Sequence, residues 1–253
     1  MTDLTGRTCL ITGASSGLGA HFARIAGKAG ARLVLGARRR DKLDALVAEL
    51  EAGGLEALAV DMDVTDEASL IAAFDAGEAR FGAIDTVIAN AGITAPGRTT
   101  EVAADAFRNL IDTNLFGALL TAREGAKRMI AGGSRESGKG RILFVGSISS
   151  FAPIQGEVAY SAAKAAIVNL CRSLAREWLR QGINVNTIQP GYIDTELAGD
   201  WFSTEGGKAQ IASFPRKRLQ PVDSLDATVL YLLSDASLHM TGSVITLDDG
   251  QSL

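Results

Sequence analysis

Residues 8–35 read TCLITGASSGLGAHFARIAGKAGARLVL, and this stretch decides the fold class. A short apolar run at residues 8–11 is followed at once by a glycine-rich turn, and then by a helical pattern that Gly30 closes. A second apolar run follows at residues 33–35. Strand, glycine turn, helix and strand in this order are the context in which a glycine fingerprint predicts dinucleotide binding.

Each glycine of the turn has a physical reason to be there. Gly13 permits a tight turn, Gly17 lets the backbone approach a pyrophosphate, and Gly19 lets the helix pack closely on the strand. The N-terminus of the helix offers unpaired N–H groups to phosphates. The spacing, Gly-x-x-x-Gly-x-Gly, departs from the commoner Gly-x-Gly-x-x-Gly, so an ordinary strand-to-helix turn stays open as the alternative interpretation.

The alternation of apolar runs and helical patterns continues to the end of the chain. Further strands are expected at residues 57–60, 86–89, 141–145, 184–189 and 243–247, and further helices at residues 40–52, 66–81, 101–110, 115–131, 157–181 and 223–233. This alternation predicts one α/β domain, residues 1–253, with a doubly wound, Rossmann-like parallel sheet of seven strands and helices on both faces. Residues 132–140 are expected to form an exposed, mobile loop.

Composition and charge narrow the classes of function. With 47% hydrophobic and 21% charged residues, the chain has ample material for a globular core, and its net charge of −4 argues against general nucleic-acid binding. No apolar run approaches the ~20 residues of a membrane helix, and the first residues do not resemble a signal peptide. Cys9 and Cys171 are typical of buried residues in a reducing compartment, so we expect a cytoplasmic protein. His21 and His239 lack partners at metal-binding spacing, and we predict no metal site.

Five residues that directly follow predicted strands are candidates for one site. They are Gly13, Asp63, Asn90, Ser147 and Gly191. Ligands of such sheets bind beyond the carboxyl ends of the strands, so these residues are expected to meet there. Taken alone, Asp63 is equally compatible with a helix cap, and Asn90 with a turn.

Tyr160 and Lys164 carry the strongest chemical signal. They are four residues apart in the helix expected at residues 157–181, which places both side chains on one face. A phenol with a pKa near ~10 is a poor acid–base catalyst at neutral pH. A neighbouring ammonium favours the phenolate and lowers this pKa. The alternative for the pair is a contact on the helix surface, worth a few tenths of a kcal/mol.

Together these motifs resemble the short-chain dehydrogenases/reductases, including the 3-oxoacyl-carrier-protein reductases, over essentially the whole chain. The matching stretches are Thr12–Gly19, Asp63–Val64, Asn90–Gly92, Asn114, Ser147, Tyr160, Lys164, Pro190–Gly191 and Thr195. One departure is Ala89, where the family often has a second asparagine. Another is the segment 132–140, which is longer than usual.

The resemblance implies four catalytic residues: Asn114, Ser147, Tyr160 and Lys164. Tyr160 would exchange a proton with the substrate oxygen as hydride is transferred, while Lys164 would lower its pKa and hold the nicotinamide ribose. Ser147 would hydrogen-bond the reacting oxygen, and Asn114, itself equally compatible with a helix cap, would hold a water connected to Lys164. Ser149 and Ser150 are alternatives to Ser147 as the serine that hydrogen-bonds the reacting oxygen, but the interval of thirteen residues to Tyr160 favours Ser147.

The resemblance also implies a cofactor site and a substrate lid. Asp63 and Val64 would meet the adenine, Asn90 would support the sheet, and Thr195 would contact the carboxamide. The full expected set is Gly13, Ser15, Ser16, Gly17, Leu18, Gly19, Arg38, Asp63, Val64, Asn90, Ala91, Gly92, Tyr160, Lys164, Pro190, Gly191, Ile193 and Thr195. Residues 192–214 would form the lid. Its aromatic pair, Trp201 and Phe202, either packs on the domain or favours an apolar substrate.

The residues after the second strand bear on the choice of cofactor. An NAD-preferring enzyme has an acid there for the ribose hydroxyls, but this chain has Ala37, followed by Arg38 and Arg39. A guanidinium can pair with a 2′-phosphate, which predicts NADP(H) rather than NAD(H). The alternative is that these arginines form a solvated start of the next helix.

We therefore expect an NADP(H)-dependent oxidoreductase that interconverts a small ketone and a secondary alcohol. Reduction of a neutral or apolar ketone is the expected direction, because cellular NADPH pools favour it. The resemblance implies a homodimer or homotetramer formed through the helices that carry Asn114 and Tyr160 and through the C-terminal strand. Basic residues on one helix, Arg123, Lys127 and Arg128, are compatible with an acidic partner or with a solvated face. The alternatives are a nucleotide-binding regulatory or scaffold protein on the same fold, or an NAD-dependent alcohol dehydrogenase.

Overall fold

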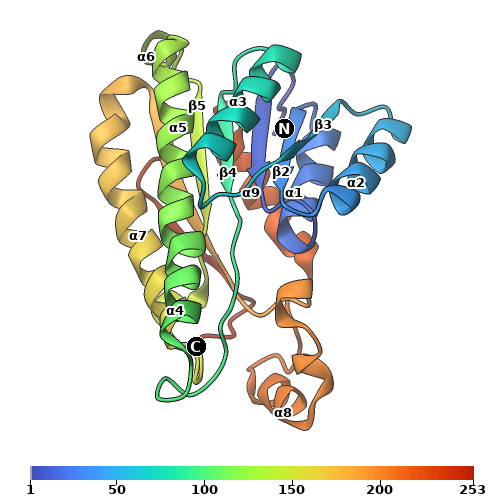
Figure 1. The fold of residues 1–253 in the computed structure, drawn as a ribbon, viewed down its shortest axis with the longest axis vertical. Helices are drawn as coiled ribbons and strands as arrows, with labels where there is room; N and C mark the ends of the chain where they lie inside the picture. The colour runs from blue at the N-terminus through green and yellow to red at the C-terminus, as the bar shows by residue number, and fades with distance from the viewer. Residues whose placement is uncertain (1) are drawn as a thin grey trace.

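A computed structural model describes residues 2–253, and its centre is a parallel sheet in the order β3-β2-β1-β4-β5-β6-β7 (Figure 1). The strands are β1 (Thr8–Thr12), β2 (Arg32–Ala37), β3 (Ala57–Asp61), β4 (Thr86–Ala89), β5 (Gly140–Val145), β6 (Ile183–Pro190) and β7 (Val244–Leu247). The chain winds outward from β1 to β3 and then crosses back to build the other half from β4 to β7. The predicted doubly wound fold is confirmed.

The helices cover both faces of the sheet. They are α1 (Gly17–Lys28), α2 (Arg40–Ala52), α3 (Glu67–Phe81), α4 (Ala104–Ile111), α5 (Gly117–Ala131), α6 (Ser134–Ser137), α7 (Val158–Trp178), α8 (Glu205–Ser213) and α9 (Asp226–Leu233). One core contains buried residues of α1, α2 and α9, and the other contains those of α3, α5 and α7. Successive residues of β1 alternate between the two cores, with Cys9 and Ile11 in the first and Leu10 in the second. This two-sided burial explains why the strands have continuous apolar sequences.

Two expected helices form one continuous rod. Between α4 and α5 the backbone makes a π-helical turn, Asp112–Phe116, which contains Asn114. The sequence placed Asn114 at a break between helices, whereas the structure places it in a locally widened turn. Such turns insert an extra residue and re-aim the side chains around them, and they are frequent at functional sites.

The segment 132–140 differs from the expected exposed loop. Residues Ser134–Ser137 form the short helix α6, and Ser134 is buried. The Ser134 hydroxyl donates a hydrogen bond of 2.6 Å to the carbonyl of Gln181, just beyond the end of α7. Polar composition suggested a solvated loop, but this hydroxyl docks the segment onto the body of the domain.

The basic residues of α5 pair within the chain. Arg123 forms an ion pair with Glu67 of α3, and Lys127 pairs with Glu124 at 2.8 Å. Arg128 contacts Glu124 at 2.8 Å, Asp75 at 2.8 Å and Glu78 at 2.6 Å. The pairs with Glu67, Asp75 and Glu78 join α3 to α5, and all of the pairs neutralise basic charge on this face, so they do not support docking of an acidic partner. No helix within residues 2–253 combines the length and the apolar character that crossing a membrane requires.

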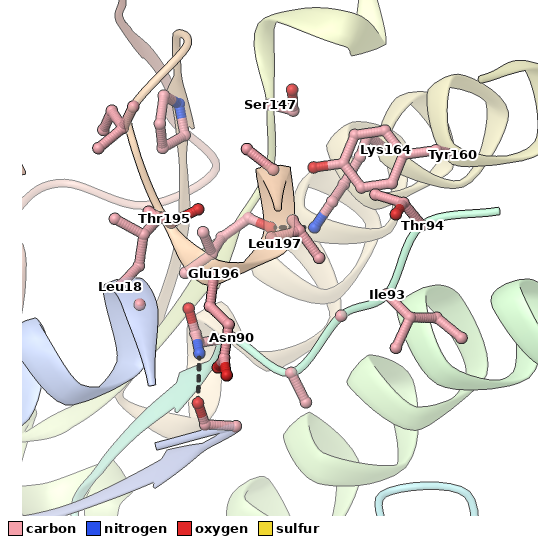
Figure 2. Close-up of a pocket in the computed structure, with 18 of the residues that line it drawn as sticks. Leu18, Asn90, Ile93, Thr94, Ser147, Tyr160, Lys164, Thr195, Glu196 and Leu197 are labelled. Carbon is pink, nitrogen blue, oxygen red and sulfur yellow. Dashed lines mark hydrogen bonds between the residues drawn. The ribbon is translucent and has the colours of Figure 1, made fainter. Parts of the chain in front are cut away.

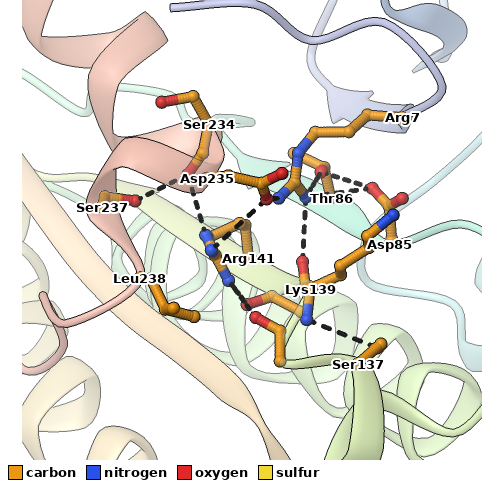
Figure 3. Close-up of polar contacts among 12 residues, drawn as sticks. Arg7, Asp85, Thr86, Ser137, Lys139, Arg141, Ser234, Asp235, Ser237 and Leu238 are labelled. Carbon is orange, nitrogen blue, oxygen red and sulfur yellow. Dashed lines mark hydrogen bonds and ion pairs between the residues drawn. The ribbon is translucent and has the colours of Figure 1, made fainter.

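An ionic network lies at the amino-terminal ends of the strands (Figure 3). The buried Arg7 guanidinium donates to the carbonyl of Lys139 at 2.9 Å and to Asp235 at 2.5 Å. Arg141, only 1% exposed, donates to the carbonyl of Gly138 at 2.8 Å and lies 3.9 Å from the same Asp235. Burial and the nearby Arg7 charge lower the pKa of Arg141 to about 10. The network joins the segment before β1, the start of β5 and the turn after α9.

Candidate active site

A cavity of about 1270 Å³ opens at the carboxyl ends of the strands. All the predicted cofactor residues except Gly19 line it, together with Ser147, and Asn114 lies outside it. The five residues expected after the strands therefore meet in one place, and Figure 2 shows two of them, Asn90 and Ser147. Within residues 2–253, no group of three or more His, Cys, Asp or Glu side chains is placed to hold a metal ion.

The glycine turn has the shape that a pyrophosphate needs. Gly13 has a φ of +64°, and a Cβ there would lie 2.8 Å from the Cα of Ala91. A Cβ on Gly19 would lie 2.4 Å from the carbonyl oxygen of Gly13, so this glycine allows the close packing predicted for it. The side chain of Ser16, the N-cap of α1, makes no capping bond, which leaves the first N–H groups of the helix for a ligand. These residues fit a dinucleotide.

Asn90 locks the turn to the neighbouring strand. Its side-chain amide donates to the carbonyls of Thr12 at 2.9 Å and Gly13 at 3.3 Å, and its backbone N–H donates to the hydroxyl of Thr12 at 3.0 Å (Figure 2). Asn90 thus joins the end of β4 to the end of β1 at the wall of the cavity.

Asn114 acts on the next segment of the cavity wall. Its Oδ1 accepts from the N–H of Ile93 and its Nδ2 donates to the carbonyl of the same residue, both at 2.8 Å. Asn114 is 1% exposed. The π-helical turn therefore fixes the backbone of Ile93, which lines the cavity. The water-holding role implied for Asn114 stays a prediction.

Tyr160 and Lys164 lie on the first two turns of α7 and point into the cavity (Figure 2). The ammonium of Lys164 donates to the carbonyl of Val145 at 2.7 Å and lies 5.5 Å from the centroid of the Tyr160 ring. Ser147 follows β5, and its Oγ accepts from the N–H of Ser149 at 3.1 Å. Ser149 is buried and does not line the cavity, which favours Ser147 as the serine that meets a substrate.

The electrostatics of the pair differ from the sequence-based expectation. Burial raises the pKa of Tyr160 to about 12, although a hydrogen bond with Ser147 lowers it, and the charge of Glu157 raises it further. Burial also lowers the pKa of Lys164 to about 8. In this arrangement the ammonium bonds the Val145 carbonyl rather than the phenol, and desolvation of the phenolate dominates the pKa of Tyr160.

The adenosine end of the cavity contains contacts that the sequence did not reveal. Arg38 is 67% exposed and lies 3.9 Å from Asp63. Arg39 instead donates to the hydroxyls of Ser15 at 3.0 Å and Ser16 at 2.6 Å, and it thereby joins β2 to the glycine turn. Both arginines line the cavity.

Arg39 and Lys42 both hold Glu196, a residue of the lid. Arg39 lies 2.9 Å and Lys42 2.5 Å from its carboxylate. The spacing of Arg39 and Lys42, three residues apart at a helix start, signals a shared face. Nothing in the sequence signals Glu196, which is 157 residues from Arg39.

The predicted lid is partly helical and projects from the body at one end (Figure 1). It contains two 3₁₀ turns, Glu196–Ala198 and Trp201–Ser203, followed by α8. The ring of Tyr192 stacks on Phe214 with a centroid distance of 5.2 Å, and the indole of Trp201 donates to Gln210 at 2.6 Å. Tyr192, Trp201 and Gln210 line the cavity, so the lid presents both aromatic and amide groups to a substrate.

Comparisons with known proteins agree with this geometry. The family model for short chain dehydrogenases matches residues 7–206. The chain is 35% identical over 245 residues to a cis-4-hydroxycyclohexanecarboxylate dehydrogenase from Sinomonas cyclohexanicum, covering 96% of both chains. It is 32% identical to gluconate 5-dehydrogenase from Gluconobacter oxydans, covering 98% of this chain and 95% of that one.

A solved structure has the same overall fold. It is a gluconate 5-dehydrogenase from Burkholderia cenocepacia in complex with NADP and tartrate, with a TM-score of 0.92 and 32% identity, covering 99% of this chain and 96% of that one. The predicted family and class of reaction, an oxidoreductase acting on alcohols and ketones, are confirmed. The chain belongs to the short-chain dehydrogenase family of NAD(P)-dependent oxidoreductases.

Proposed function

We propose that the protein is an NADP(H)-dependent reductase of small ketones. The observation that carries the choice of cofactor is the cationic adenosine end of the cavity, where Arg38 and Arg39 follow Ala37 and no acid occupies the position after β2. A guanidinium forms charge-assisted hydrogen bonds with a phosphate, whereas an acid there would repel it. The NADP bound by the gluconate 5-dehydrogenase neighbour supports the same choice.

The catalytic residues act as follows. Residues of the glycine turn, together with Arg38 and Thr195, would hold a nicotinamide cofactor, which when bound would supply the hydride for the substrate carbon. Tyr160 donates its proton to the carbonyl oxygen, and Ser147 hydrogen-bonds that oxygen and stabilises the negative charge that develops there. Lys164 contributes positive charge on the side of the cavity where the phenolate forms. In alcohol oxidation the phenolate of Tyr160 removes the hydroxyl proton.

The substrate is a neutral ketone with polar groups. The cations that line the cavity, among the described residues, are Arg38, Arg39 and Lys164, and the two arginines lie at the adenosine end. Glu157 lies close enough to Tyr160 to raise its pKa, so its charge repels a carboxylate on the substrate. Gln155 and Gln210 also line the cavity and offer amides to a second hydroxyl or carbonyl group.

A spectrophotometric panel at 340 nm tests the reaction. Cyclic ketones, hydroxyketones and keto acids are offered with NADPH and with NADH. We expect turnover of a neutral ketone, with NADPH the better cofactor. Tight nucleotide binding without turnover of any ketone or alcohol would favour a binding protein instead.

Two variants test the choice of cofactor. Arg38→Ala and Arg39→Ala should each raise the Michaelis constant for NADPH far more than that for NADH. Equal effects on both cofactors would contradict the 2′-phosphate assignment.

We also propose a homo-oligomer, formed through the face that carries α4, α5 and α7, in a cytoplasmic protein. Exposed apolar side chains on or next to these helices support it: Phe116 (49%), Ile130 (40%) and Val158 (54%). A partner subunit that packs on these helices would bury such side chains. Light scattering coupled to size exclusion distinguishes monomer, dimer and tetramer.

A further inference from the structure

The first turn of the lid is tied across the cofactor cavity by one carboxylate. Glu196 accepts from Arg39 at 2.9 Å and from Lys42 at 2.5 Å, and Ser16 of the glycine turn also hydrogen-bonds it. These three contacts hold its pKa far below the usual range for a glutamate. The carboxylate is therefore charged at neutral pH.

A phosphate group would form the same hydrogen bonds and ion pairs with these residues. Two cations and a serine hydroxyl converge on one pair of anionic oxygens, and phosphate oxygens take the same donors in the same way. The partners come from two elements of the adenosine end, the start of α2 and the glycine turn, whereas Glu196 comes from the lid. Three of the four residues, Ser16, Arg39 and Glu196, line the cavity.

We propose that Glu196 competes with the 2′-phosphate of the cofactor for Arg39 and Lys42. Glu196 thereby lowers the affinity for phosphorylated nucleotides, and a 2′-phosphate that takes these cations releases the beginning of the lid. The inference rests on the proposed binding of NADP(H), and it adds a residue that sets the preference between the two cofactors.

The position of Glu196 explains how release of one side chain affects the lid. Its neighbour Thr195 lies against the glycine turn, where a Cβ on Gly17 would be 3.6 Å from the Thr195 Cβ. Trp201 follows five residues later and lines the cavity. Loss of the tie to Arg39 and Lys42 therefore frees the turn that connects the end of β6 to Trp201.

The test compares two nucleotides that lack nicotinamide, so that its readout is independent of activity. Adenosine 2′,5′-bisphosphate and adenosine 5′-monophosphate are titrated calorimetrically into the wild type and into Glu196→Gln. The matched control is Glu205→Gln, which removes a lid charge that is 93% exposed and pairs only locally with Lys208 at 2.8 Å.

We expect Glu196→Gln to bind the bisphosphate roughly three- to ten-fold more tightly at low salt, because the exposed pairs are weak and screened. Its affinity for the monophosphate and both affinities of Glu205→Gln should change less than about two-fold. The proposed competition would be overturned if Glu196→Gln bound both nucleotides more tightly by the same factor. It would also be overturned if the ratio of the two affinities stayed as in the wild type, or if the bisphosphate bound more weakly.

The emission of Trp201 reports the lid, with the buried Trp178 as a constant background. The bisphosphate should shift the emission of the wild type, and the monophosphate should not, while Glu196→Gln should show the shifted emission before nucleotide is added. A wild type that binds both nucleotides equally would contradict the NADP(H) proposal. If Glu196→Gln then gained a preference for the bisphosphate, the competition would still stand, and if it did not, both proposals would fail.

Discussion

The Tyr160 hydroxyl is placed where burial works against its ionisation. A phenol with a pKa of about 12 is protonated at neutral pH, which suits a proton donor in carbonyl reduction. In the opposite direction the phenolate must form, and the hydrogen bond with Ser147 favours it by lowering the pKa. The carboxylate of Glu157 opposes this effect, and one of its oxygens is buried without a hydrogen-bond partner.

Replacing Tyr160 by phenylalanine should separate chemistry from binding. The variant retains the ring that packs beside Lys164 but loses the proton donor, so turnover should fall by about 10²–10⁴-fold or more. Binding of NADPH, followed by fluorescence titration, should change little. Retained turnover would show that another group supplies the proton.

Replacing Glu157 by glutamine should change the pH dependence. The Glu157 charge raises the pKa of Tyr160, so its removal lowers that pKa. Alcohol oxidation requires the phenolate and speeds up as pH rises through this pKa. Its acid limb should therefore move to lower pH in the variant, measured as kcat against pH.

The control for this shift is Glu101→Gln, which removes an exposed charge that pairs with Arg98 and does not line the cavity. Its pH profile should coincide with that of the wild type. An unchanged profile in Glu157→Gln would mean that Glu157 does not affect the phenol.

Among the elements, the junction of β1 with α1 depends on close backbone contact. Gly19 lies in the first turn of α1, where a Cβ would meet the backbone of Gly13 at 2.4 Å. Backbone atoms there cannot move aside without moving the turn that Asn90 holds. The element therefore cannot accept even one methyl group at this position.

Gly19→Ala should lower the free energy of unfolding by about 1–3 kcal/mol, because overpacking outweighs the gain in helix propensity. Thermal unfolding monitored by circular dichroism measures this, and nucleotide affinity should fall as well. Gly27→Ala in the same helix is the control, because its Cβ would meet side-chain methyl groups of Leu55 and Leu33 at 3.0 and 3.1 Å. These methyl groups can move aside, so the free energy of unfolding of Gly27→Ala should stay close to that of the wild type.

At the scale of the whole molecule, the alternation of strands and helices was enough to predict the sheet and the edge at which the site lies. Parallel strands buried on both faces leave an unmistakable apolar sequence, and the glycine turn fixes the direction of the first unit. The contact between Arg39 and Glu196 was not predictable, because it joins residues far apart in the chain. The direction of the Tyr160 pKa was missed because burial cannot be read from a spacing of four residues.

The network at the opposite end of the sheet should govern stability without affecting the site. Asp235 is shared by two buried guanidiniums, but it is itself 75% exposed, so Asp235→Ala should cost about 1–2 kcal/mol rather than the full value of a buried pair. Denaturant unfolding measures the loss, with Asp105→Ala, which breaks a surface pair with Arg108, as the control. Michaelis constants should not change. A variant as stable as the wild type would show that the two guanidiniums do not depend on Asp235.

The amine of Lys164, which bonds the Val145 carbonyl, is also a site for selective chemical labelling of the enzyme. Because burial lowers the pKa of Lys164 to about 8, a larger share of its amine is uncharged in mildly alkaline buffer than of an ordinary lysine with a pKa near ~10.4. Uncharged amines are nucleophiles, so a small acylating reagent that enters the cavity should modify Lys164 early. Bound nucleotide should protect it, and mass spectrometry of the labelled peptide would then count intact active sites in a preparation.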